Sequence, residues 1–106
     1  MVERGDIWLV ALDPTLGSEI RKARPCLVVS PDEMHGHLRT VIVAPMTTGS
    51  HAAPFRVPLR HANKRGLVLL DQLRTVDKVR LVRRLGAASS TTLRETLSVL
   101  REVFAD

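Results

Sequence analysis

The chain has 106 residues, of which 44% are apolar, so it is long enough for the packed core of one domain and too short for two. Sixteen Lys and Arg against eleven Asp and Glu give a formal charge of +5, which favours a polyanionic partner, although a basic surface that serves only solubility is the alternative. Only 3% of the residues are aromatic, so the core must be aliphatic and stacking on bases is limited to Trp8, Phe55 and Phe104.

The N-terminal segments predict two strands joined by a long loop. Residues 6–12 are rich in strand-forming side chains, and the turn residues of 13–18 bring that strand to an end. Because proline holds its preceding neighbour in an extended conformation, a second strand is predicted over residues 24–30. Cys26 lies inside this strand without a partner for an internal disulfide, so we expect a small core residue in a reducing compartment.

The middle of the chain predicts three more strands. Residues 34–39 form a polar connection, and the apolar run that follows predicts a strand over residues 40–45. Residues 55–59 predict a shorter strand, which the polar stretch 60–65 separates from a nearly continuous apolar run at 67–70. A short run that is apolar at every position is consistent with a central, fully buried strand.

The last third of the chain changes from a strand pattern to a helix pattern. Residues 75–78 predict a short helical turn, and residues 79–85 alternate apolar and basic side chains as a strand does. Gly86 closes that strand. Apolar residues at spacings of four, three and four then predict one face of a helix, formed by Leu93, Leu97, Leu100 and Phe104 and widened by Val103.

The start of this helix has two interpretations, and the succession of elements predicts the fold class. Thr92 and Glu95 have the spacing of a capping box, while Ser89 or Ser90 is the alternative N-cap. Short strands followed by one amphipathic helix predict a mainly β, α+β fold: a small, strongly curved antiparallel sheet or half-open barrel with the helix on one side. We find no repeat or linker and expect a single domain over residues 1–106. No segment resembles a secretion signal or a membrane span, so we expect a cytoplasmic protein.

Three polar residues at strand edges are candidates for gripping a phosphate. Arg24 projects from a rigid strand start, and its five donors and permanent charge suit phosphate oxygens. Thr47 follows the strand over 40–45, where its hydroxyl can hydrogen-bond a phosphate oxygen or the attacking group. Glu19, in the loop before Arg24, can orient the guanidinium or accept a proton. Each also has a plain structural interpretation, as a surface arginine, a turn threonine and an exposed loop carboxylate.

Two further pairs of polar residues have weaker patterns. Asp71 and Gln72 follow four apolar residues at the end of a predicted strand, a favoured place for functional side chains, although the capping of a turn explains Asp71 equally well. His35 and His37 have the alternate spacing that can place two imidazoles on one side of an extended segment. No Cys or further ligand pattern accompanies them, so we expect no metal site and no other cofactor.

Six blocks of residues, taken together, resemble the MazF/PemK family of toxin endoribonucleases from type II toxin–antitoxin systems. They run nearly end to end in the family's order: Arg4-Gly5-Asp6-Ile7-Trp8, Leu12-Asp13-Pro14-Thr15, Gly17-Ser18-Glu19, Arg24-Pro25, Val43-Ala44-Pro45-Met46-Thr47 and Leu70-Asp71-Gln72-Leu73-Arg74-Thr75-Val76-Asp77. Any one block is weak. Six blocks at compatible spacing in so short a chain make a specific signal.

The resemblance implies a fold and a set of partners. The fold is a strongly bent, half-open, SH3-like sheet of the CcdB/Kid type with a C-terminal helix. The implied assembly is a homodimer with single-stranded RNA along the subunit interface, and a MazE-like antitoxin whose acidic tail covers the RNA path, which the basic balance of this chain suits. Whether mRNA, tRNA or rRNA is cut, and at which sequence, stays open because it depends on the loops at residues 16–23 and 49–54.

The resemblance also implies a reaction. The ribose 2′-hydroxyl of the RNA attacks the adjacent phosphorus without a metal ion, leaving a 2′,3′-cyclic phosphate and a 5′-hydroxyl, and the cleavage inhibits translation and growth. Arg24 matches the family arginine that stabilises charge on the phosphorane, and Thr47 matches the threonine that positions the phosphate or the 2′-hydroxyl. Glu19 is the nearest group able to act as a base or to orient Arg24. The positions that line the RNA path are Ser18, Thr48, Asp71 and Gln72.

One departure from the family pattern and two alternatives remain. The Kid/PemK branch has a histidine where this chain has Ser18 and an arginine where it has Leu69, so the aspartate base proposed for that branch transfers poorly to Asp71. A noncatalytic, CcdB-like gyrase poison has no need for a phosphate-gripping trio on neighbouring loops. A relative that binds RNA without cutting it is expected to lose these motif residues.

Overall fold

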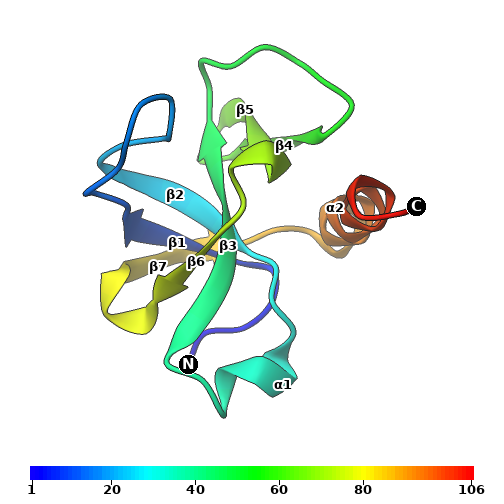
Figure 1. The fold of residues 1–106 in the computed structure, drawn as a ribbon. Helices are drawn as coiled ribbons and strands as arrows, with labels where there is room; N and C mark the ends of the chain where they lie inside the picture. The colour runs from blue at the N-terminus through cyan, green and yellow to red at the C-terminus, as the bar shows by residue number, and fades with distance from the viewer.

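The computed structural model describes residues 1–106 and shows a mainly β chain that ends in a helix (Figure 1). Neither α-helix has the length and apolar character that a membrane-spanning helix requires. The elements in chain order are β1 (Asp6–Ala11), β2 (Ala23–Val28), α1 (Asp32–His35), β3 (Thr40–Thr47), β4 (Arg56–His61), β5 (Lys64–Leu69), the 3-10 turn η1 (Leu70–Gln72), β6 (Arg74–Asp77), the 3-10 turn η2 (Lys78–Arg80), β7 (Leu81–Ala87) and α2 (Ser90–Val103).

The long strand β3 joins the two halves of the sheet. The strand order is β4-β5-β3-β2-β1-β7, with β6 paired to β3 beside this path. The first part of β3 pairs with β6 and its middle with β2, whereas its last residues, Met46 and Thr47, pair with Val68 and Leu67 of β5. Figure 1 shows β1, β2 and β7 on one side of β3 and the β4–β5 pair above it. The expected strongly curved antiparallel sheet with a C-terminal helix is therefore confirmed.

Irregular pairing between β1 and β7 adds to the curvature. The register shifts between Ile7 and Trp8 and again between Leu9 and Val10, so β7 carries an extra residue at each point. Bulges of this kind bend the strand that carries them and increase the local twist. The sheet consequently curls toward β7, as a half-open barrel requires.

Apolar side chains cover both faces of the sheet because successive residues of a strand point to opposite sides. In β2, Cys26 and Val28 belong to one buried cluster, and Leu27 belongs to the other. The first cluster is Ile7, Leu27, Val29, Ala44, Met46, Val57, Leu59, Val68 and Leu70, and α2 packs on it through Val99 and Leu100. The second, on the opposite face, is Val10, Leu12, Cys26, Val28, Val41, Val43 and Val76.

The helix α2 begins where the second of the two N-cap interpretations places it. The Ser89 hydroxyl accepts a hydrogen bond from the Thr92 backbone N–H at 3.1 Å, so Ser89 is the N-cap and the Thr92–Glu95 capping box is wrong. The predicted apolar face is shorter than expected at its C-terminal end. Phe104 is 74% exposed and Val103 is 46% exposed, because the helix runs past the edge of the sheet that it covers.

Two segments predicted as irregular or helical form strands instead. Residues 60–65 contain the ends of β4 and β5, joined by a two-residue turn at Ala62 and Asn63, both of which have positive φ. The turn signal was weak because Ala rarely occupies that conformation. Residues 75–78 lie mostly in β6, and the helical turn begins only at Lys78, because pairing with β3 overrides the local pattern.

A one-turn helix, α1, replaces part of the polar connection predicted at residues 34–39. His35 at its end is buried, and its Nε2 lies 2.6 Å from the Ser30 hydroxyl. That hydroxyl also accepts a hydrogen bond from the Ile42 backbone N–H at 3.0 Å. These two bonds anchor the turn beneath β3, and the sequence pattern gave no sign of them.

Candidate functional site

Arg24 and Thr47 lie on adjacent strands at one cavity. The β2–β3 register pairs Cys26 with Pro45, and two further residues along each strand bring Arg24 opposite Thr47. Both line a cavity of about 430 Å³ whose apolar wall includes Leu9, Leu59 and Leu85. We call this space the cationic cavity, and its other polar lining residues are Thr48, His61, Lys64 and Arg83.

The polar groups of Arg24 and Thr47 retain free donors. The Arg24 Nε donates to the Arg21 carbonyl oxygen at 3.2 Å, while the two terminal amino groups of the guanidinium bond to no other residue. The Thr47 hydroxyl accepts from the Gly49 backbone N–H at 3.2 Å, which holds its orientation and leaves its own hydrogen free to donate. The two side chains therefore offer preoriented donors to an anion in the cavity.

The charge of the cavity comes from strands that are distant in sequence. Lys64 lies on β5, Arg83 on β7 and Arg24 on β2, and none of the three is ion-paired. No carboxylate lines the cavity. A concave, low-dielectric space walled by one sign of charge concentrates the opposite charge, here the phosphates of a polyanion.

Sequence analysis did not single out His61, Lys64 or Arg83. The alternating basic residues of 79–85 were a signal for Arg83, whose side chain had to face one side of a strand. His61 and Lys64 flank the Ala62–Asn63 turn and pair with each other across the hairpin, so they were hidden in the stretch interpreted as a polar connection. Only the pairing of β5 with β3 brings this hairpin to Thr47.

Gly66 permits the close approach of β5 to Thr47. A Cβ atom at this position would lie 2.9 Å from the Thr47 carbonyl oxygen and 3.4 Å from its carbonyl carbon. Backbone atoms cannot move aside as the end of a flexible side chain can. The absence of a side chain at Gly66 is therefore a local requirement for placing Thr47 at the cationic cavity.

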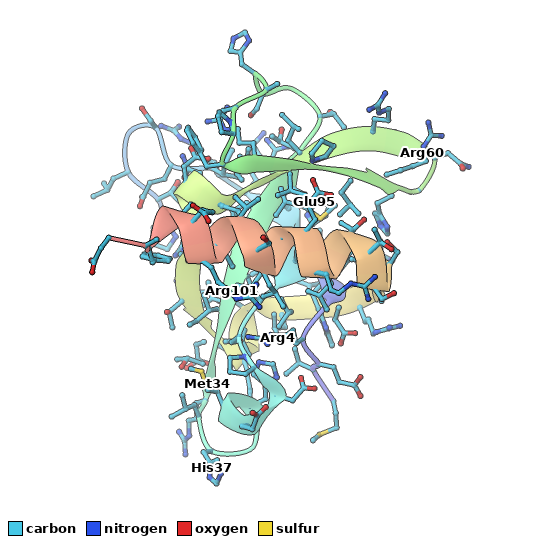
Figure 2. The ribbon with its side chains drawn as sticks, turned by 90° about the vertical axis from the view of Figure 1, so that its right-hand side faces the viewer. Arg4, Met34, His37, Arg60, Glu95 and Arg101 are labelled. Carbon is cyan, nitrogen blue, oxygen red and sulfur yellow. The ribbon has the colours of Figure 1, made fainter.

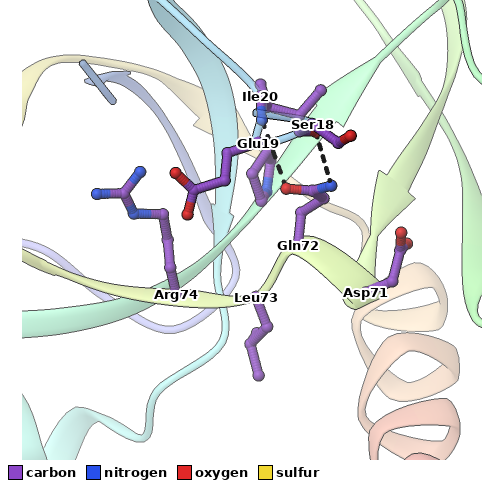
Figure 3. Close-up of a pocket in the computed structure, with 8 residues that line it drawn as sticks. Ser18, Glu19, Ile20, Asp71, Gln72, Leu73 and Arg74 are labelled. Carbon is purple, nitrogen blue, oxygen red and sulfur yellow. Dashed lines mark hydrogen bonds between the residues drawn. The ribbon is translucent and has the colours of Figure 1, made fainter. Parts of the chain in front are cut away.

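The remaining candidates line a second, neighbouring cavity of about 340 Å³, which we call the loop cavity (Figure 3). Its polar lining residues are Ser18, Glu19, Asp71, Gln72 and Arg74. The Gln72 side-chain amide bridges it: Oε1 accepts from the Ile20 N–H and Nε2 donates to the Ser18 carbonyl oxygen, each at 3.4 Å. Of the seven candidates, the structure thus brings Arg24, Thr47 and Thr48 together and collects the other four next to them.

Glu19 is engaged within its own loop. Its Oε1 accepts a hydrogen bond of 2.5 Å from the Leu16 backbone N–H, and it forms no ion pair with Arg24. Figure 3 shows the side chains of Glu19 and Arg74 extending toward the same side of the cavity. Arg74 lies in the last of the six family blocks but was not among the candidate site residues. It donates to the Leu12 carbonyl oxygen at 3.2 Å and so ties β6 to the end of β1.

Asp71 is held in a two-point ion pair with Arg56. The guanidinium Nε and Nη2 of Arg56 donate to the two carboxylate oxygens at 3.1 and 2.9 Å, and Nη1 donates to the His51 carbonyl oxygen at 3.0 Å. The hydrogen bonds from Arg56 hold the pKa of Asp71 below its usual range, although partial burial opposes the shift. They raise the pKa of Arg56 in turn. Asp71 is therefore a weak proton acceptor that fastens the β3–β4 loop.

Two other reactive residue types are built into the core. Burial raises the pKa of the Cys26 thiol to about 12, and the nearby charge of Arg74 only partly opposes this, so the thiolate is inaccessible at neutral pH. His35 is buried against Ser30, whereas His37 is exposed at the far tip of the molecule (Figure 2). The two imidazoles consequently do not share one side of the chain.

Comparison with known proteins gives consistent matches over nearly the whole chain. The family model of PemK-like, MazF-like toxins of type II toxin–antitoxin systems matches residues 3–104. Endoribonuclease PemK from Escherichia coli is 40% identical over 108 aligned positions, which cover 96% of this chain and 81% of that protein. The crystal structure of MazF from Deinococcus radiodurans is similar with a TM-score of 0.84 and 29% identity, covering 96% of this chain and 94% of that one. A MazE–MazF structure from the same organism matches at a TM-score of 0.77 and 25% identity, covering 96% and 94%.

Proposed function

Because the chain belongs to the PemK-like, MazF-like endoribonuclease toxins of type II toxin–antitoxin systems, we propose that it cuts single-stranded RNA at the cationic cavity without a metal ion. One observation carries this proposal: Arg24 and Thr47 meet at one rim with free, preoriented donors, in a cavity lined by two more fixed positive charges and no carboxylate. Positive side chains and free donors of this kind stabilise the negative charge that a phosphodiester gains during cleavage.

The proposed reaction uses the substrate's own nucleophile. The ribose 2′-oxygen bonds to the adjacent phosphorus, the bond from phosphorus to the 5′-oxygen breaks, and the products carry a 2′,3′-cyclic phosphate and a 5′-hydroxyl. The protein then has to align the two oxygens, stabilise charge on the phosphorane and move protons. DNA lacks the 2′-hydroxyl and is bound without being cut.

Arg24 and Thr47 divide the phosphate between them in this scheme. The terminal amino groups of Arg24 donate to the nonbridging oxygens, where negative charge grows as the phosphorane forms, and this interaction is stronger in the transition state than in the ground state. The Thr47 hydroxyl donates to a nonbridging oxygen from β3, the strand that pairs with the strand of Arg24. Thr48, Lys64 and Arg83 hold the same and neighbouring phosphates by charge and hydrogen bonding.

The loop cavity takes the nucleotide next to the scissile phosphate in this proposal. Ser18, Glu19, Asp71 and Gln72 offer hydrogen-bonding groups there, and neither cavity is lined by Trp8, Phe55 or Phe104. Base recognition is consequently by hydrogen bonds to splayed bases rather than by aromatic stacking. The loops at residues 16–23 and 49–54, which Gln72 and the Asp71–Arg56 pair fasten, set the recognised sequence.

The partners follow from the charge of the site. We propose that the toxin works as a homodimer and that a MazE-like antitoxin inhibits it by laying an acidic segment along the cationic cavity, where it competes with RNA phosphates. The MazE–MazF structure from Deinococcus radiodurans, which resembles this chain in fold, supports such a pairing.

The test is cleavage of a long single-stranded RNA by purified protein in excess EDTA, with cut sites and end groups mapped. The expected result is cutting at one short motif with 5′-hydroxyl ends and cyclic phosphates. Arg24→Ala should cut about 10²- to 10³-fold more slowly. Arg39→Ala, which removes an exposed arginine outside both cavities, should cut as the wild type does. Cutting that occurs only when a divalent metal is restored would overturn the metal-free reaction. Binding without cutting would favour an RNA-binding relative, and gyrase inhibition without cutting would favour a CcdB-like poison.

A further inference from the structure

We propose that His61 is the general base of the reaction, taking the proton from the 2′-hydroxyl as that oxygen attacks phosphorus. This inference rests on the proposed function and adds the one group that Arg24 and Thr47 cannot supply. It comes from the position of the imidazole, which lines the same cavity as both residues that hold the phosphate.

His61 is positioned by the hairpin and by β7. It is the last residue of β4, paired with Lys64 across the Ala62–Asn63 turn, and it is half-buried. Its ring meets the end of β7, where a Cβ atom added at Gly86 would lie 3.6 Å from the imidazole Cε1. This is an ordinary van der Waals distance, so the imidazole lies against the backbone of β7 where it lines the cavity.

The other ionisable candidates, Arg24, Glu19 and Asp71, are less suited to act as the general base. Arg24 carries a guanidinium that stays protonated in proteins. The Glu19 carboxylate accepts the Leu16 N–H and lines the loop cavity rather than the cationic one. Asp71 holds Arg56 at two points, and this ion pair lowers its basicity. Among the residues that line the cationic cavity, only His61 has a side chain that ordinarily gains and loses a proton near neutral pH.

The charges around the imidazole suit a proton acceptor. The groups that share its cavity are Arg24 of β2, Lys64 of β5 and Arg83 of β7, all positive. The helix α2 also contacts β4, and its Glu95 points toward the β4–β5 hairpin (Figure 2), but no ion pair joins it to His61. No carboxylate lines the cavity, so no acidic side chain there competes with the imidazole for the 2′-hydroxyl proton.

The step balances with water as the only other participant. A ring nitrogen of His61 takes the 2′-hydroxyl proton, the 2′-oxygen forms its bond to phosphorus, and the bond between phosphorus and the 5′-oxygen breaks. The 5′-oxygen takes a proton from a solvent water, and the imidazolium returns its proton to solvent. One proton has then moved from the 2′-oxygen to the 5′-oxygen.

The test is His61→Ala measured with and without added imidazole. We expect kcat to fall about 10²- to 10⁴-fold, the range that one positioned acid–base group contributes, with KM for RNA changed less than about threefold. Free imidazole should restore part of the rate, in proportion to the concentration of its neutral form. His61→Gln, which keeps packing against Gly86, should be equally slow. His37→Ala, an exposed histidine far from both cavities, should behave as the wild type.

The pH dependence separates a base from a structural group. A general base makes kcat rise with pH until the base is deprotonated, after which kcat levels off. This rise and plateau should be present in the wild type and lost in His61→Ala. A His61→Ala protein that is as fast as the wild type, or that is slow, unrescued by imidazole and unchanged in pH profile, would overturn the inference. Neither result would touch the proposed function, which fails only if the wild type itself does not cut RNA in EDTA.

Discussion

The cationic cavity and the loop cavity are neighbours of similar size, yet they differ in how many of their side-chain polar atoms already bond to the protein. In the cationic cavity the terminal amino groups of Arg24 and the hydroxyl hydrogen of Thr47 are free, and Lys64 and Arg83 have no ion-pair partner. In the loop cavity, by contrast, Asp71 and Gln72 use both of their side-chain polar atoms in bonds to the protein, and Glu19 uses one of its two carboxylate oxygens.

This difference distinguishes a group that waits for a ligand from a group that shapes the site. A donor already satisfied by the protein must give up that bond before it can bind RNA, so it gains little from the exchange. A donor that the fold holds in place without a protein partner gives up only water when the phosphate arrives. This difference is why we place the proposed chemistry in the cationic cavity. The bonds in the loop cavity hold the adjoining loops.

Apart from that of His61→Ala, the largest effect should come from replacing Arg24, whose guanidinium lies at the cationic cavity. Arg24→Ala should lower kcat/KM for RNA cleavage about 10²- to 10³-fold, the usual cost of one donor aimed at developing charge. Arg24→Lys keeps the charge but loses the planar pair of donors, so it should recover only part of the rate. Circular dichroism and the melting temperature should stay close to wild type, because Arg24 lies at a strand start outside the core. A large loss of stability in either variant would contradict this view.

The next effect tests whether the close approach of β5 to Thr47 matters for activity. Gly66→Ala should lower both activity and stability, because its Cβ would press on the Thr47 carbonyl group at 2.9 Å and push β5 away from β3. We expect roughly a tenfold loss of kcat or more, since small displacements of a positioned group are costly. The measurement is single-turnover cleavage together with thermal unfolding. Gly36→Ala, at a position with open space, is the matched control.

A smaller effect is expected in the loop cavity. Asp71→Asn should change kcat less than about threefold and lower the melting temperature by less than about 6 °C, because an exposed ion pair contributes little. Since the folded-state pKa of Asp71 is depressed, its contribution to stability is present above the unfolded pKa of about 3.9 and is lost as pH falls through the folded value. The difference between wild type and variant should therefore be full at pH 7 and vanish in strong acid. A loss of kcat as large as that of Arg24→Ala would place the chemistry at Asp71 instead.

The smallest effect concerns the turn that presents His61 and Lys64. Ala62 has a φ of +50°, which costs a residue with a Cβ about 1 kcal/mol, so Ala62→Gly should raise the free energy of unfolding by up to that amount. Chemical denaturation measures the change, and RNA cleavage should stay within about twofold of wild type. Ala52→Gly, in the exposed β3–β4 loop without positive φ, should give no such gain.

Local pattern was a good guide wherever an element is decided by its own residues. The strands β1, β2 and β3, the aliphatic core and the buried Cys26 follow from alternation and composition. Local pattern failed where contacts with a distant segment of the chain determine the secondary structure. Pairing with β3 placed residues 75–77 in β6, and the turn at α1 is tied through Ser30 to Ile42 of β3, twelve residues along the chain.

The sequence alone determined the family, the curved sheet with its C-terminal helix, and the presence of Arg24 and Thr47 at strand ends, because these depend on local periodicity and on motifs in a set order. Only the tertiary structure decided which polar residues share a cavity. Strand register and the bend at β3 set that grouping through contacts far apart in the chain: they bring His61, Lys64 and Arg83 to Thr47 and turn Glu19 and Asp71 toward the neighbouring cavity. No local pattern in one sequence carries this information, since it resides in the pairing of strands.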